Sequence, residues 1–172
     1  MYYINFENDV FIDEDINLEP IKDIFRIYLN KCDSFQIKIL KEDAKYKKVL
    51  EDYEIYSDDN EYEYIFQGLI DEDFKEMILE NLIGEMAINF TDISLYKDGI
   101  LKLEIINFGS EVYIYDFDEK TVVEFAEELE KIYGIKDINV YTDDEDLDEH
   151  NHEHNHNCSC HGDSCNHNHI LH

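Results

Sequence analysis

The chain has 172 residues, which suits one domain with a short appendage. Its hydrophobic content of 44% is enough for a packed core, but its net charge of −29 repels nucleic-acid phosphates and anionic membranes. The first residues lack a secretory signal and no stretch of about 20 apolar residues occurs, so we expect a cytoplasmic protein that binds neither nucleic acid nor membrane.

The N-terminal half alternates predicted strands and helices. Apolar residues at every second position predict three strands, at residues 2–6, 35–39 and 62–66. Between the first two strands, Asn17 is the expected N-cap of an amphipathic helix that has Pro20 in its first turn. The buried stripe of this helix is predicted to contain Ile21, Ile24, Phe25, Tyr28 and Leu29. A shorter helix is expected at residues 46–53, and the polar run 57–60 predicts a turn.

The C-terminal half begins with a helix that Asp71 caps, that buries Phe74 and Met77 and that Gly84 ends. The hydrophobic period then changes to two, which predicts consecutive strands at residues 87–90, 93–96, 100–107 and 112–117. The last helix runs from its cap, Asp118, to Gly134, followed by a strand at 138–141. Its inner side is predicted to contain Val122, Phe125, Ala126, Leu129, Ile132 and Tyr133.

This order of elements predicts the α+β class, with a mixed or largely antiparallel sheet and about four helices. We assign this domain to residues 1–141. Residues 142–149 contain one apolar residue, so they predict an acidic, disordered spacer. The remaining segment, 150–172, is rich in histidine and cysteine, and we call it the His/Cys tail.

The His/Cys tail contains all 8 histidines of the chain and three of its four cysteines. Imidazole nitrogens and thiolate sulfurs are the usual protein ligands of zinc, nickel, cobalt and copper. The candidate metal ligands are His150, His152, His154, His156, Cys158, Cys160, His161, Cys165, His167, His169 and His172. Their spacing differs from that of zinc fingers, which favours a flexible chelator for Ni²⁺ or Zn²⁺, with Co²⁺ or Cu⁺ as further candidates.

The His/Cys tail resembles the histidine-rich C-terminal extensions of nickel metallochaperones, such as the urease accessory chaperone and the prolyl-isomerase chaperone of hydrogenase maturation. The resemblance covers residues 149–172 only and is one of composition. It implies storage or delivery of nickel. Residues 1–141 resemble neither family.

No catalytic motif occurs in the domain. It contains no histidine, so a Ser-His-Asp or Cys-His arrangement cannot form there. Phosphate-binding and dinucleotide-binding glycine motifs are missing as well. Cys32 is interpreted as a structural cysteine. We therefore expect a protein that is not an enzyme.

Two functional hypotheses follow. In the first, the protein stores, buffers or delivers a transition metal, with metal ions and a client protein as partners. In the second, the acidic domain is a protein-interaction module for basic surfaces, and the His/Cys tail is incidental or a metal-responsive regulator. The high acidity is equally well explained by solubility or by adaptation to a salty cytoplasm.

Overall fold

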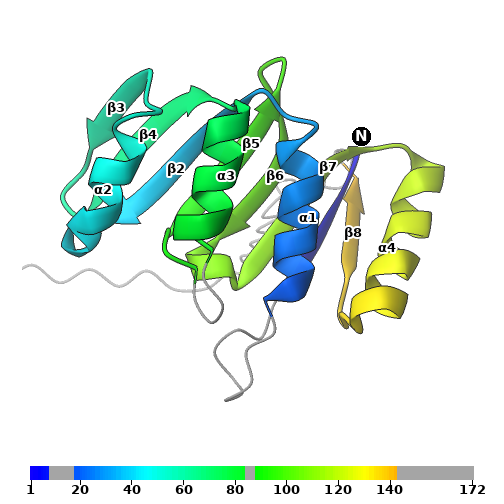
Figure 1. Ribbon diagram of the computed structural model, residues 1–172. Coiled ribbons are helices and arrows are strands. Elements are labelled where there is room, and N and C mark those ends of the chain that lie inside the picture. Colours follow the sequence, from blue (N-terminus) through cyan, green and yellow to red (C-terminus); the bar gives the residue numbers. More distant parts are fainter. Residues whose placement is uncertain (8–17, 84–87, 143–172) are drawn as a thin grey trace, which may run out of the picture.

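The computed structural model describes residues 1–7, 18–83 and 88–142. Four helices and an eight-stranded sheet make up this part of the chain (Figure 1). The helices are α1 (Glu19–Leu29), α2 (Ala44–Leu50), α3 (Glu72–Asn81) and α4 (Glu119–Tyr133). The strands are β1 (Tyr2–Glu7), β2 (Ser34–Leu40), β3 (Tyr56–Asp59), β4 (Glu63–Leu69), β5 (Asp92–Lys97), β6 (Ile100–Ile106), β7 (Glu111–Phe117) and β8 (Asn139–Thr142).

The strand order across the sheet is β3-β4-β2-β5-β6-β7-β1-β8. Every strand pairing is antiparallel, so the predicted α+β class is confirmed. Strand β1 lies between β7 and β8, and β8 forms one edge of the sheet. Because β8 ends at Thr142, it includes the first residue of the predicted spacer.

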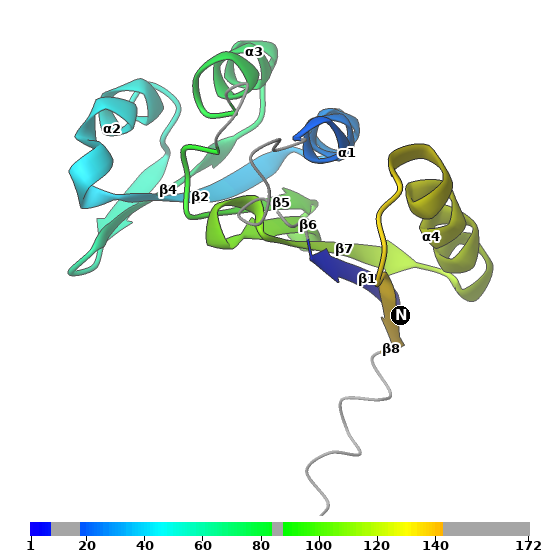
Figure 2. The same cartoon turned by 90° about the horizontal axis from the view of Figure 1, so that it is seen from below.

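All four helices lie on one face of the sheet (Figure 2). On that face, the central strands β1, β2, β5, β6 and β7 contribute a layer of apolar residues, most of which are fully or almost fully buried. Strand register places Ile4, Ile114, Leu103, Leu95 and Phe35 in one row across five strands. The predicted stripe of α1 is buried against this layer at all five positions. The hydrophobic core therefore lies entirely between the sheet and its single layer of helices.

Two predicted helix caps are confirmed. The side chain of Asp71 accepts a hydrogen bond from the backbone N–H of Phe74 at 2.8 Å. At the start of α4, the side chain of Asp118 accepts hydrogen bonds from the backbone N–H groups of Lys120 and Thr121. The C-cap of this helix is Gly134, which has a left-handed φ of 69°. The predicted cap Asn17 lies outside the described residues, and Leu18 occupies the N-cap position of α1 without a side-chain cap bond. The predicted helix stop, Gly84, lies outside the described residues, and α3 ends at Asn81.

Three predictions are wrong. The run 57–60 is not a turn, because most of it belongs to edge strand β3, and Asn60 makes the turn by accepting bonds from Tyr62 and Glu63. Within the predicted strand 87–90, Ala87 lies outside the described residues and only Ile88 makes an isolated bridge, to Ile83. Ile132 of α4 is 65% exposed, because this helix covers only the outermost strands.

Candidate functional site

The eleven predicted metal ligands, from His150 to His172, all lie outside the described residues. Within residues 1–7, 18–83 and 88–142, no group of three or more histidine, cysteine, aspartate or glutamate side chains is placed to hold a metal ion. The structure therefore leaves the predicted metal site untested.

Cys32 follows α1 and is buried, with 8% of its surface exposed. Burial, and secondarily the neighbouring carboxylate of Asp33, raise the pKa of the thiol to about 11. A thiol with this pKa stays protonated at neutral pH, whereas nucleophiles and metal ligands need the thiolate. This agrees with the interpretation of Cys32 as a structural cysteine.

The second face of the sheet is not covered by any helix of the described residues (Figure 2). Strand register places one polar residue from each of the eight strands in a single line across this face. We call this line the polar row. It consists of Tyr56, Gln67, Gln36, Ser94, Glu104, Tyr113, Asn5 and Asn139.

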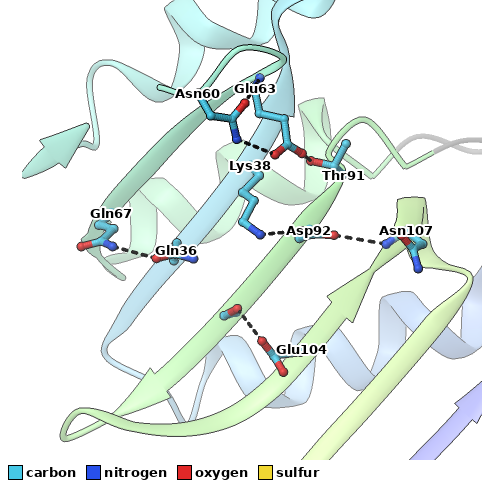
Figure 3. Close-up of polar contacts among 10 residues, drawn as sticks. Gln36, Lys38, Asn60, Glu63, Gln67, Thr91, Asp92, Glu104 and Asn107 are labelled. Carbon is cyan, nitrogen blue, oxygen red and sulfur yellow. Dashed lines mark hydrogen bonds and ion pairs between the residues drawn. The ribbon is translucent and has the colours of Figure 1, made fainter. Parts of the chain in front are cut away.

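Neighbouring side chains on this face are linked by hydrogen bonds and ion pairs (Figure 3). Within the polar row, Gln67 donates to Gln36 at 2.7 Å, and Ser94 donates to Glu104 at 3.1 Å. Beside the row, the ammonium of Lys38 pairs with Asp92 at 2.8 Å. The pKa of Lys38 is raised, chiefly by the hydrogen bond to Asp92, so this lysine is already neutralised by its partner.

Four tyrosines form a continuous stack on β7, β1 and β8. The ring centroids of Tyr141 and Tyr3 lie 5.0 Å apart, those of Tyr3 and Tyr115 5.6 Å, and those of Tyr115 and Tyr113 6.5 Å. All three pairs are close to parallel, with interplanar angles of 28° or less. We call these residues the tyrosine stack. It places a polarisable aromatic surface at one end of the polar row.

Two partly buried glutamates lie beside the tyrosine stack. The carboxylate of Glu104 accepts hydrogen bonds from the hydroxyls of Ser94 and Tyr115, the latter at 2.7 Å. Glu111 accepts from the hydroxyl of Tyr113 at 2.9 Å and from the amide of Asn107. Among the described residues, no ion pair involves either carboxylate. Both carboxylates are therefore hydrogen-bonded to neutral groups, and Glu104 also interacts electrostatically with the ammonium of Lys38.

Asn5 lies in the middle of β1, between Tyr113 and Asn139 in the polar row. This residue is 9% exposed, and its side-chain amide nitrogen has no hydrogen-bond acceptor among the described residues. A buried donor without an acceptor costs about 1–3 kcal/mol. Such groups are rare in native proteins, and a water, an ion or another molecule can supply the missing acceptor.

No known protein family, curated protein or solved structure matches this chain. The function must therefore be inferred from its own residues. No described helix is both long enough and apolar enough to cross a membrane.

Neither the polar row nor the tyrosine stack was predicted from the sequence as a candidate site. In most of the strands, polar residues or tyrosines alternate with the apolar core residues, for example Gln36 and Lys38 in β2 and Tyr113 and Tyr115 in β7. This alternation indicates a sheet with one buried face and one solvent-exposed face. The strand order, which brings β1 between β7 and β8, is what assembles the row.

The tyrosine stack leads to a prediction about alkaline stability. Burial and the hydrogen bond to Glu111 raise the pKa of Tyr113 to about 12, and the pKa of Tyr115 is raised by burial and by Glu104. Because the folded pKa exceeds the ordinary value of about 10, these groups stabilise the fold fully below pH 10 and lose that contribution as the pH rises toward 12.

We therefore expect the free energy of unfolding, measured by urea titration, to fall between pH 10 and 12 and to do so less steeply in Tyr113→Phe. The exposed residue Tyr62 provides the control, since a Tyr62→Phe variant should retain the alkaline loss of the parent chain. An identical alkaline loss in Tyr113→Phe and the parent would contradict this prediction.

Proposed function

We propose that this protein binds transition-metal ions through the His/Cys tail and serves in their storage, buffering or delivery. Ni²⁺ and Zn²⁺ are the leading ions, with Co²⁺ and Cu⁺ as further candidates. One observation carries the proposal. Eleven imidazole and thiol groups occur within residues 150–172, whereas the preceding 149 residues contain no histidine and a single, buried cysteine.

The position of the tail in the chain supports a role in delivery. The described domain ends in edge strand β8, so residues 143–172 leave from the border of the sheet rather than from its core. Thirty residues at about 3.3 Å each reach at most roughly 100 Å when fully extended. The acidic residues at the start of this segment, such as Asp143 and Asp144, attract cations toward the ligands.

Protonation controls the proposed binding. Only neutral imidazoles and thiolates donate electron pairs to a metal, so binding displaces protons. An ordinary histidine titrates near pH 6.5, and the histidine-only part of the tail, His150–His156, should therefore release metal as the pH falls below about 6.

A cobalt titration tests the involvement of the tail cysteines. Co²⁺ added to the reduced, full-length chain should produce the thiolate-to-metal charge-transfer absorption, because Cys158, Cys160 and Cys165 become ligands. Replacing these three cysteines with serine should abolish that absorption while weaker binding by the histidines remains.

A Cys32→Ala variant is the matched control for the cobalt titration. The thiol of Cys32 is protonated and buried, which makes it a poor metal ligand, so its removal should leave the absorption unchanged. The proposal fails if the triple serine variant keeps the band, or if Cys32→Ala loses it.

A further inference from the structure

The helix-free face of the sheet has a strong excess of negative charge. Register places six carboxylates on it: Glu7, Asp58, Glu63, Asp92, Glu104 and Glu111. Of these, Asp92 is paired with Lys38, while the remaining five take part in none of the ion pairs found among the described residues. A partly buried surface on which carboxylates outnumber cations, and most of them form no direct ion pair, favours binding of a cation.

The tyrosine stack adds a second binding property to the same face. Aromatic rings attract guanidinium and ammonium groups through their π-electrons, and arginine also stacks on tyrosine. Glu104 and Glu111 lie in hydrogen-bond contact with two members of this stack, Tyr115 and Tyr113. A cation placed here meets carboxylate oxygens and ring faces at once.

We propose that this face, centred on Glu104, Glu111 and the tyrosine stack, is the docking surface for a basic, arginine-bearing segment of a partner protein. The planar guanidinium suits these groups, because it donates hydrogen bonds to carboxylate oxygens and also stacks on tyrosine rings. A carbonyl group of the same segment would supply the acceptor that the buried amide of Asn5 lacks.

Charge complementarity selects a partner protein over two other occupants. The chain's own residues 143–172 carry eight acidic residues and no lysine or arginine, so they are repelled by this face. A second copy would bring the same carboxylates against each other. This surface lies within the described domain, so the inference is independent of metal binding by the tail.

The test uses the full-length chain with a metal chelator present, so that the His/Cys tail cannot contribute. The probe is a short peptide in which arginine alternates with serine, and its binding is followed by nuclear magnetic resonance. We expect the amide signals of β6, β7 and β1 to shift, and the affinity to fall as the salt concentration rises. A peptide in which glutamate alternates with serine should not bind.

A charge-matched pair of double variants locates the site. Glu104→Gln combined with Glu111→Gln should weaken peptide binding about fivefold to tenfold, since two charged contacts are lost. Glu127→Gln combined with Glu128→Gln changes the net charge equally on an exposed part of α4 and should leave binding unchanged. Thermal unfolding of each variant establishes that it is folded.

Three results would overturn the proposal. They are equal weakening in the two double variants, shifts confined to the helices, and the absence of peptide binding at low salt. Concentration-dependent dimerisation that the Glu104→Gln and Glu111→Gln substitutions change would assign the face to a second copy instead. Because a chelator is present throughout, none of these results bears on the metal-binding function.

Discussion

Replacing Phe74 with alanine is expected to lower the free energy of unfolding by about 3–5 kcal/mol. The ring is completely buried where α3 packs on the sheet. Its centroid lies 4.0 Å from that of Phe35 in a nearly parallel stack, and Tyr53 packs edge-on against it at 5.7 Å. Alanine would leave a cavity between α3 and β2, and aromatic contacts worth about 1 kcal/mol each would be lost.

Urea denaturation followed by circular dichroism measures this loss. A Phe74→Leu variant, which fills most of the space, should lose clearly less stability than Phe74→Ala. If the free energy of unfolding of Phe74→Ala falls by less than about 1 kcal/mol, the Phe74 ring is not packed between α3 and the sheet in the folded protein.

The second large effect is expected at Gly68 of β4. A methyl group added to this residue would lie 2.2 Å from the backbone oxygen of Tyr53 and 2.7 Å from a ring carbon of Phe35. Backbone atoms and a stacked ring cannot move aside easily, so Gly68→Ala should cost about 3 kcal/mol, the upper end of the usual range for overpacking.

Gly99 offers the control for this substitution. It lies in the turn between β5 and β6 with φ of 77°, and a methyl group there would have no atom within 4 Å. Gly99→Ala should therefore cost only the strain of a left-handed backbone, roughly 1 kcal/mol. If denaturation shows equal losses for the two variants, close packing is not the reason for glycine at position 68.

Gly68, and Phe35 whose ring stacks on Phe74, also border the outer face of the sheet. Phe35 and Gly68 help to line a groove of about 300 Å³ on the helix-free face, together with Tyr56, Gln67 and Tyr96. The exposed residues Ile55 and Leu69 form its apolar border. The groove thus lies at the β3 end of the polar row, beside Tyr56, Gln67 and Gln36.

Elements with strong local signals were predicted correctly from the sequence. Asp71 and Asp118 were recognised as caps because a cap depends only on its own side chain and the next few backbone N–H groups. The dipeptide Asp98–Gly99 is typical of a tight hairpin turn, and both residues have positive φ. The buried stripe of α1 followed from helical spacing alone.

Features that depend on distant partners were missed. Strand β3 is exposed at all four residues and forms only because β4 offers hydrogen bonds, so its polar sequence resembles a turn. Ile132 has the spacing of a buried residue, but α4 lies at the border of the sheet, where little covers it. The polar row required the strand order, which no local pattern contains. The eleven metal ligands remain a prediction from the sequence.

The number of metal ions that the protein retains tests the proposed function most directly. The reduced, full-length chain is dialysed after exposure to Ni²⁺ or Zn²⁺ at neutral pH, beside a variant with all eight histidines replaced by asparagine and the three tail cysteines by serine. We predict about two or three ions per parent chain, at roughly four donors each, and background amounts in the variant. Equal metal contents in the two proteins would contradict the account.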